Sequence, residues 1–224
     1  CLYLFAGQTR DDGMVSACLF TEPKFIVDDT FLLDYSMFYG AALLDYYKAS
    51  GDMETLRDLS KCAYRQMELA GKQFDEKDLL ICGEGFWAFI DWTDGLDKQA
   101  AMQGVYIYCA KKVREIAEIL GDTEKAAELA KEEKAKTEAA KKYLLDSEAG
   151  LFVSGPDRQI NYASQVWMVL AGAVDKAGSI TEASAAKILS KPSNLFKSAF
   201  KEVVSPCHTA FSNLALPDLS TPST

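Results

Sequence analysis

The sequence predicts an all-α protein built of helical hairpins, and three observations lead to this fold class. Three pairs of helical segments follow one another along the 224 residues, and a glycine separates the two members of each pair. Gly51, Gly121 and Gly178 stand where the C-terminus of a helix favours a left-handed residue. An Asp or a Thr follows each of these glycines within three positions, where the next helix needs an N-cap. Connections this short make the two helices of a pair antiparallel.

The two members of each pair differ in composition. The leading helices are rich in aromatic residues and in alanine and glycine, which permits close packing. The trailing helices carry more charge and are amphipathic, most clearly over residues 124–142. This difference predicts an inner layer of leading helices covered by an outer layer of trailing ones. The expected pairs are residues 33–49 with 52–72, 97–120 with 122–145, and 160–177 with 181–190.

The two ends of the chain fit the hairpin pattern less well. Residues 1–23 carry few helix signals, and residues 207–224 end in a stretch rich in proline and serine. We therefore expect a helical domain over residues 1–206 and an irregular C-terminal tail over residues 207–224.

Composition excludes several classes of function. The formal charge of −9 argues against nucleic acid as a partner, because phosphate binding needs clustered Lys and Arg. No apolar run reaches the ~18–20 residues of a membrane span, so we expect no membrane insertion. The six cysteines are scattered and His208 is the single histidine, so we expect structural thiols and neither a metal nor another cofactor.

The loops that precede the leading helices hold the candidate binding residues. They span residues 27–32, 83–97 and 152–159, and in a ring of parallel inner helices all three would emerge at the same end. The middle loop combines two tryptophans, two phenylalanines and four carboxylates with glycines. Flat apolar faces beside hydrogen-bond acceptors suit a ring that carries many hydroxyl groups. The sequence therefore predicts a sugar-binding site at this end.

Several side chains are candidates for contact with the sugar, and each has an alternative role. The tryptophans could instead lie in the core, the two aspartates could cap helices, and the glutamate and the arginine could lie in solvated turns. For Trp92 we expect contact with the apolar face of the sugar, and for Asp91 a hydrogen bond from a hydroxyl, whereas for Trp87 a place in the core is favoured over the same contact. The candidates are Asp91, Trp92, Trp87, Glu84, Asp34 and Arg158.

The chain resembles the catalytic helical domain of bacterial α-L-rhamnosidases of the six-hairpin glycosidase type, from about residue 11 to residue 206. Each matching motif is short, and their order along the chain makes the resemblance specific. The motifs are Asp12-Gly13-Met14-Val15, Asp34-Tyr35-Ser36-Met37-Phe38, Phe89-Ile90-Asp91-Trp92, Leu96-Asp97-Lys98-Gln99-Ala100-Ala101, Gln103-Gly104-Val105-Tyr106 and Ser164-Gln165-Val166-Trp167-Met168-Val169-Leu170-Ala171-Gly172.

The resemblance implies an (α/α)6 toroid, of which this chain supplies about three of the six hairpins, so residues 1–206 are expected to form a partial domain. It also implies inverting hydrolysis of terminal L-rhamnose by a carboxylic acid and a carboxylate about 6.5–9.5 Å apart. The family's general acid lies upstream of the Asp12-Gly13 match and its general base lies downstream in a Trp-Glu-Arg-Trp-like motif. Neither motif is present, so no catalytic residue is assigned and the chain alone is expected to be inactive.

The resemblance implies three further expectations. Asp91 and Trp92 match the Asp-Trp pair at the family's substrate pocket, and the partner is a rhamnosylated carbohydrate or glycoside. A half-toroid would expose an apolar inner face, so we expect self-association. A bacterial origin is implied, but the sequence does not distinguish a cytoplasmic, periplasmic or secreted protein.

Three competing interpretations stay open. Another six-hairpin glycosidase, acting on a different sugar, would share the scaffold. A non-catalytic helical-repeat binding domain would also show paired helices, although a solenoid gives no reason to gather Trp and Asp in loops at one end. Asp28 and Asp29 could hold Mg²⁺ against a diphosphate, as in isoprenoid synthases, but no second metal motif is evident.

Overall fold

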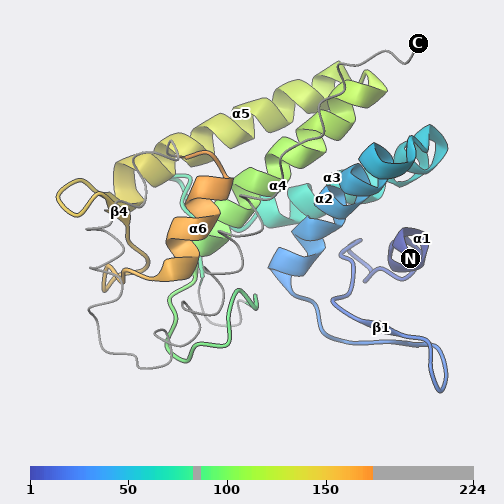
Figure 1. Cartoon of the computed structure of the whole chain (residues 1–224), viewed down its shortest axis with the longest axis horizontal. Helices are drawn as coiled ribbons and strands as arrows, with labels where there is room; N and C mark the ends of the chain where they lie inside the picture. Colours follow the sequence, from blue (N-terminus) through green and yellow to red (C-terminus); the bar gives the residue numbers. More distant parts are fainter. Residues whose placement is uncertain (83–86, 174–224) are drawn as a thin grey trace, which may run out of the picture. The chain divides into compact units, whose positions relative to one another are not determined.

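The computed structural model describes residues 1–82 and 87–173. They form six α-helices and two short antiparallel strand pairs, joined by loops (Figure 1). All of these residues belong to one unit, Cys1–Ser184. A π-helical turn, η1 (Ala140–Leu144), continues α5. The helices are α1 (Leu2–Ala6), α2 (Leu33–Ser50), α3 (Met53–Gly71), α4 (Gln99–Leu120), α5 (Thr123–Ala139) and α6 (Tyr162–Leu170), and the strands pair as β1 (Leu19–Phe20) with β2 (Ile26–Val27) and β3 (Leu145–Asp146) with β4 (Leu151–Phe152).

The first two predicted hairpins are confirmed, and local capping explains them. Gly51 and Gly121 end α2 and α4 in the left-handed region, with φ of 70° and 74°. The Asp52 carboxylate accepts a hydrogen bond from the backbone of Thr55 (3.0 Å) and so caps α3. Asp122 caps α5 in the same way. Each glycine thus ends one helix and the following aspartate starts the next.

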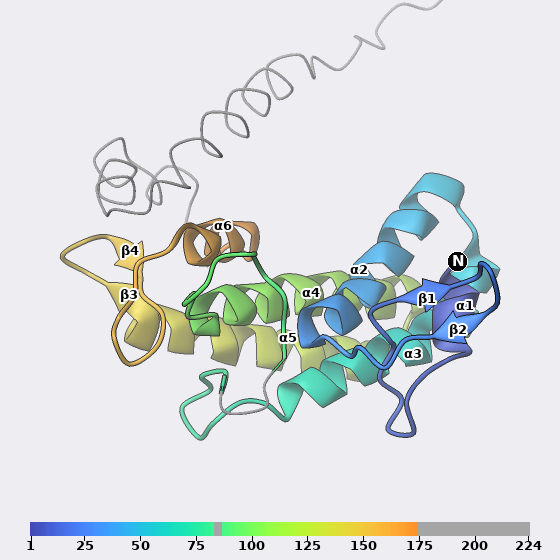
Figure 2. The same cartoon turned by 90° about the horizontal axis from the view of Figure 1, so that it is seen from below.

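The leading helices α2, α4 and α6 form one layer, with α4 in the middle in contact with both of the others. α3 and α5 lie outside them, α3 against α2 and α4, and α5 against α4 (Figure 2). The predicted apolar stripe of α3 faces this layer, since Leu56, Leu59, Ala63 and Met67 are all buried. Amphipathic helices thus cover a layer of aromatic and small residues, and the fold class is all-α as predicted.

Buried glutamines connect loops to the helices through both the oxygen and the nitrogen of their side-chain amides. Gln66 of α3 accepts from the backbone of Val15 (3.1 Å) and donates to the carbonyl of Gly13 (2.9 Å). Gln165 of α6 accepts from Phe152 N–H (2.9 Å) and donates to the carbonyl of the same residue (2.8 Å). Because every buried backbone group needs a partner, these amides permit irregular chain to pack against the helices.

The structure corrects the sequence-based boundaries in two places. The third leading helix ends at Leu170 and not at Ala177, because the chain turns there with Gly172 in the left-handed region at φ 68°. Residues 1–23, expected to be irregular, contain the five-residue helix α1. The predicted break at Gly178, the helix over 181–190 and the tail over 207–224 lie outside the described residues.

Two further findings concern membrane-spanning helices and cysteines in the described part. None of its helices combines the length and the apolar character that crossing a bilayer requires. Its five cysteines are all free, and Cys109 is fully buried in the core, as expected of a structural thiol.

Candidate functional site

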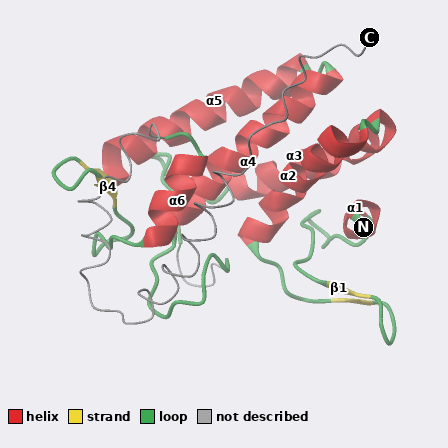
Figure 3. Ribbon diagram, in the orientation of Figure 1, coloured by secondary structure: helices red, strands yellow, loops and turns green. Residues whose placement is uncertain are grey.

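The loops that precede α2, α4 and α6 meet one another, as the sequence predicts. The backbone N–H of Leu33 donates to the carbonyl oxygen of Trp87 (3.1 Å), which joins the first loop to the second. The N–H of Asp97 donates to the side-chain oxygen of Gln159 (3.0 Å), which joins the second loop to the third. These two hydrogen bonds join the three loops at the N-terminal ends of the leading helices, and Figure 3 draws the described parts of the loops in green.

A pocket of about 560 Å³ opens among these loops, and we call it the loop pocket. Most of its wall comes from residues 87–98, and the first loop adds Leu32. Its lining combines aromatic rings, carboxylates and one ammonium group. The residues that matter for its chemistry are Trp87, Phe89, Asp91, Trp92, Asp94 and Lys98.

The two tryptophans of the loop pocket are exposed. Trp92 is 88% exposed, so it does not lie in the core. Trp87 is 58% exposed, so the core position favoured for it from the sequence is wrong. Phe89 supports Trp92 edge-to-face, with ring centroids 4.7 Å apart. Large apolar rings left in water at the mouth of a pocket are typical of ligand-binding surfaces. Both rings are free to pack against the C–H face of a sugar.

Asp91 lies beside Trp92 in the wall of the loop pocket. One carboxylate oxygen accepts from the N–H of Trp92 (2.7 Å) and the other from the hydroxyl of Thr93 (3.4 Å). Asp91 is not a helix cap, because α4 begins only at Gln99. A carboxylate has about four acceptor positions, so Asp91 retains capacity for hydroxyl groups of a ligand.

Asp34 lies in the first turn of α2 and holds the backbone of the loop that forms the wall of the loop pocket. It is 1% exposed, and its carboxylate accepts from the N–H groups of Phe89 (3.1 Å) and Ile90 (3.1 Å). Ile90 has φ of 55°, an unusual value for a β-branched residue. Asp34 therefore anchors a strained loop and does not cap its own helix, while its direct contact with a sugar stays a prediction.

Two structural features of the site have no clear signal in the sequence. The Nζ of Lys98 donates to the carbonyl of Ala88 (2.5 Å), which brings a cation into the loop pocket, although the sequence gives no reason to separate Lys98 from surface lysines. Asp97 joins the loops, since its carboxylate accepts from the hydroxyl of Ser154 (2.7 Å) and from the N–H of Gln99 (3.0 Å).

The remaining predicted site residues do not join the loop pocket in the described part of the chain. Arg158 is exposed, has φ of 49°, and forms an ion pair with Asp146 (3.1 Å). Its neighbour Gln159 holds the second loop instead, because it also donates to the carbonyl of Gly95 (2.9 Å). Glu84 lies outside the described residues. The structure thus gathers Trp87, Asp91 and Trp92, and their contact with a sugar stays a prediction.

Neither the Cys82 thiol nor the paired Asp28 and Asp29 shows the features of a second reactive site in the described part of the chain. Burial raises the pKa of the Cys82 thiol to about 12, with a further contribution from the Asp97 carboxylate, so the reactive thiolate is disfavoured. Among residues 1–82 and 87–173, no group of three or more His, Cys, Asp or Glu side chains is placed to hold a metal ion. Asp28 and Asp29 therefore gain no support as a magnesium site.

Helical hairpins in two layers, with aromatic and acidic loops gathered at one end, define an all-α, toroid-like glycosidase scaffold. No protein-family model and no curated protein sequence matches the chain. Among solved structures, a rhamnosidase from Klebsiella oxytoca with rhamnose bound is 37% identical, with a TM-score of 0.81 over 95% of this chain. By this identity and fold, the chain belongs to the rhamnosidase family as a partial segment.

Two more distant structures share the fold. A GH78 family rhamnosidase of Bacillus sp. GL1 is 17% identical, with a TM-score of 0.58 over 76% of this chain and 19% of its own. A Streptomyces avermitilis α-L-rhamnosidase complexed with L-rhamnose is 17% identical, with a TM-score of 0.59 over 88% of this chain and 17% of its own. The chain spans 42% of the Klebsiella rhamnosidase.

Proposed function

We propose that this segment forms part of the substrate-binding wall of a glycoside hydrolase that removes terminal L-rhamnose from a carbohydrate or glycoside. The observation that carries the proposal is the loop pocket, in which Asp91 and two exposed tryptophans lie together, in a chain 37% identical to a rhamnosidase with rhamnose bound. In this function Trp92 and Trp87 pack against the C–H face of the sugar and Asp91 accepts from a hydroxyl. Lys98 adds a donor from the same wall.

The reaction that we propose is inverting hydrolysis with a general acid and a general base supplied by residues outside this chain. In such a reaction the acid protonates the leaving oxygen and the base activates a water on the opposite face of the sugar. Asp91 and Asp94 lie in the loop pocket, but both are exposed and lie three positions apart in one loop. A general acid needs a buried environment, and neither position offers one.

A chimera tests this proposal. The chain replaces the matching segment of the Klebsiella oxytoca rhamnosidase, and hydrolysis of p-nitrophenyl α-L-rhamnoside is measured for the chimera and for the isolated chain. We expect activity in the chimera and none in the isolated chain. In the chimera, Trp92→Ala should lower kcat/KM roughly 10- to 100-fold, which corresponds to a lost contact of about 1.4–2.8 kcal/mol.

The matched control for this substitution is Trp167→Ala, because Trp167 packs between Phe38 and Tyr108 in the helical layer. That variant should lower stability, with its kcat/KM falling only as far as the folded fraction falls. A folded chimera with no activity would refute the assignment to rhamnoside hydrolysis. Activity in the isolated chain would place the acid and the base within these residues.

We also propose that the chain self-associates through the apolar face of its leading helices. A groove of about 330 Å³ beside α1 and α2 is lined mostly by apolar side chains, among them Phe5, Tyr35 and Phe38. Tyr46 of α2 and Leu170 of α6 are also exposed. Sedimentation velocity over a dilution series should show dimers or larger species that dissociate on dilution. A monomer at every concentration would contradict this proposal.

A further inference from the structure

The side chain of Asn161 connects the start of α6 to the wall of the loop pocket. The residue is 7% exposed. Its side-chain oxygen caps α6, since it accepts from the backbone N–H of Ser164 (2.9 Å). Its side-chain nitrogen donates to the backbone carbonyl of Asp97 (3.1 Å) and to the side-chain oxygen of Gln159 (3.2 Å). The two ends of one amide group therefore serve two different parts of the fold.

The partners of Asn161 hold the end of the pocket wall. The neighbours of Asp97 on both sides line the loop pocket. The side chain of Gln159 accepts from the N–H of Asp97 (3.0 Å) and donates to the carbonyl of Gly95 (2.9 Å), and Gly95 also lines the loop pocket. We call the hydrogen bonds that Asn161 and Gln159 form with Gly95 and Asp97 the loop clasp.

Close packing of the third loop against Asp97 leaves the loop clasp little room to shift. Ser154 is fully buried, and its hydroxyl donates to the Asp97 carboxylate (2.7 Å). Gly155 has φ of 67°, and a Cβ at that position would overlap a carboxylate oxygen of Asp97. A loop that is held on a rigid helix keeps its geometry better than a free loop. Since α6 begins directly after Asn161, the pocket wall is held on the start of that helix.

We propose that Asn161 is a positioning residue of the loop pocket, which keeps residues 95–98 in the orientation that the sugar requires. Asn161 does not line the loop pocket and acts through Asp97 and Gln159. The proposal rests on the rhamnoside-binding role proposed above for the loop pocket. A displacement of about 1 Å in a group that holds a substrate can lower the rate by about 100-fold, so such an anchor has a measurable effect.

Asn161→Asp separates the cap of α6 from the loop clasp, because the two side chains have the same shape. A carboxylate oxygen still accepts from the N–H of Ser164, and a negative charge is favourable at the start of a helix. The other carboxylate oxygen cannot donate, and it would face the carbonyl of Asp97 and the side-chain oxygen of Gln159. We therefore expect α6 to stay folded while the loop clasp opens.

Fluorine NMR of the full chain labelled with 5-fluorotryptophan measures both effects at once. Of the three tryptophans, Trp87 and Trp92 line the loop pocket and Trp167 lies in α6, and Trp→Phe variants assign the signals. In Asn161→Asp, the signals of Trp87 and Trp92 should shift or broaden, and that of Trp167 should stay at its parent position. In Asn161→Ala, which also removes the cap, all three should change. No sugar is present, so this measurement does not depend on the proposed function.

A second variant acts on the loop clasp without touching a helix. Gln159→Glu keeps the acceptor for the N–H of Asp97 but removes the donor to the carbonyl of Gly95 (2.9 Å). Because Gln159 lies in the third loop and not at the cap of α6, its replacement leaves the start of that helix intact. The signals of Trp87 and Trp92 should change as they do in Asn161→Asp.

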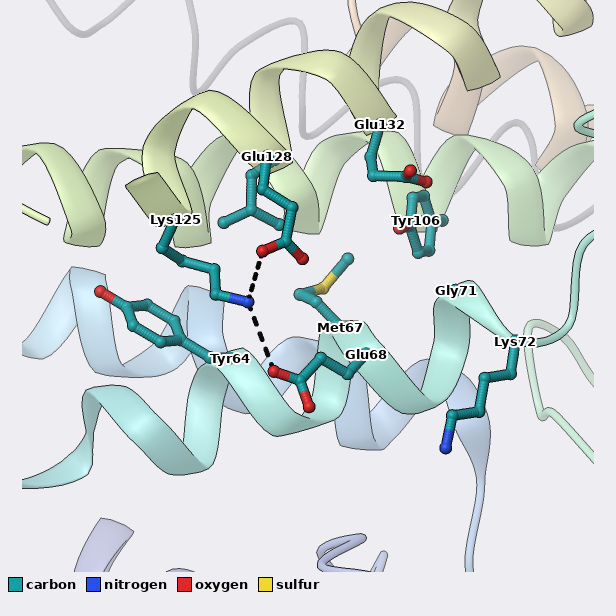
Figure 4. A pocket seen from close by; sticks show the side chains of 10 residues that line it. Tyr64, Met67, Glu68, Gly71, Lys72, Tyr106, Lys125, Glu128 and Glu132 are labelled. Carbon is teal, nitrogen blue, oxygen red and sulfur yellow. Dashed lines mark hydrogen bonds and ion pairs between the residues drawn. The ribbon is translucent and has the colours of Figure 1, made fainter. Parts of the chain in front are cut away.

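Asp122→Asn is the matched control, since it exchanges the same two groups at the cap of α5. Its carboxylate accepts from the N–H of Lys125 (3.0 Å), which an asparagine oxygen can also do. Lys125 lies in the groove between α3, α4 and α5, where it forms ion pairs with Glu68 (3.3 Å) and Glu128 (2.8 Å) (Figure 4). That groove shares no lining residue with the loop pocket, so the control should leave all three tryptophan signals unchanged.

Kinetics in the Klebsiella chimera distinguish a positioning role from a structural one. Asn161→Asp should raise KM for p-nitrophenyl α-L-rhamnoside roughly tenfold, with kcat changed by less than about threefold. A merely structural role would lower kcat in proportion to the folded fraction and leave KM unchanged, because the molecules that remain folded would bind the substrate normally.

Three results would overturn the proposal. The first is a parent spectrum of Trp87 and Trp92 in Asn161→Asp. The second is an equal change of all three signals in that variant beside a parent spectrum in Gln159→Glu, since Asn161 would then act only as a helix cap. The third is an unchanged KM in an active chimera. An inactive chimera beside the expected fluorine spectra would refute rhamnoside hydrolysis but support the anchoring of the wall, so the two failures are distinguishable.

Discussion

Replacement of Gly104 by alanine is expected to lower the free energy of unfolding by about 3 kcal/mol. The glycine lies in the middle of α4, where that helix approaches α6. A Cβ at this position would lie 2.8 Å from the carbonyl carbon of Trp167 and 3.0 Å from the backbone nitrogen of Met168. Because these are backbone atoms, no side-chain rotation can relieve the clash, and the two helices must separate. Urea denaturation followed by circular dichroism measures the change.

Gly71→Ala is the matched control for this prediction. It also adds one methyl group to a helical glycine, but the only atom within 4 Å is the Tyr106 hydroxyl at 3.4 Å. Since alanine is a better helix former than glycine, this variant should keep the parent stability or gain about 0.5–1 kcal/mol. If both variants unfolded at the same urea concentration, the close approach of α4 and α6 would not limit the fold.

The helices could be predicted from the sequence because their signals are local. Gly51 followed by Asp52, and Gly121 followed by Asp122, encode the end of one helix and the cap of the next within adjacent residues. The layer to which each helix belongs also follows from its own composition. The meeting of the three loops then follows from the parallel direction of the leading helices. These features depend on no partner that is distant in the sequence.

The roles of particular side chains could not be predicted because their partners are distant in the sequence. Asp34 stands in the first turn of a helix, where capping explains an acid, but its partners Phe89 and Ile90 lie 55 and 56 residues away. In the same way, Lys98 resembles any lysine before a helix, and only the fold directs it to Ala88.

Asp34→Ala is expected to lower the free energy of unfolding by about 2–4 kcal/mol and to disorganise the loop pocket. It removes the acceptor of two backbone N–H groups, and each buried donor left without a partner costs about 1–3 kcal/mol. It also releases Ile90, whose left-handed conformation at φ 55° needs such support. Urea denaturation gives the loss of stability, and fluorescence quenching of Trp87 and Trp92 by acrylamide follows the loop itself.

Asp34→Asn separates positioning from sugar contact. The asparagine oxygen can still accept from both N–H groups, in weaker neutral hydrogen bonds, so stability should fall by about half as much as in Asp34→Ala. Asp45→Ala, an exposed position on the same helix, should change stability by less than about 0.5 kcal/mol. In the Klebsiella chimera, a positioning role predicts that rhamnoside hydrolysis falls in step with the loosening of the loop across Asn and Ala. An equal and complete loss of hydrolysis in both variants, with the loop still ordered in Asp34→Asn, would instead assign Asp34 to the sugar.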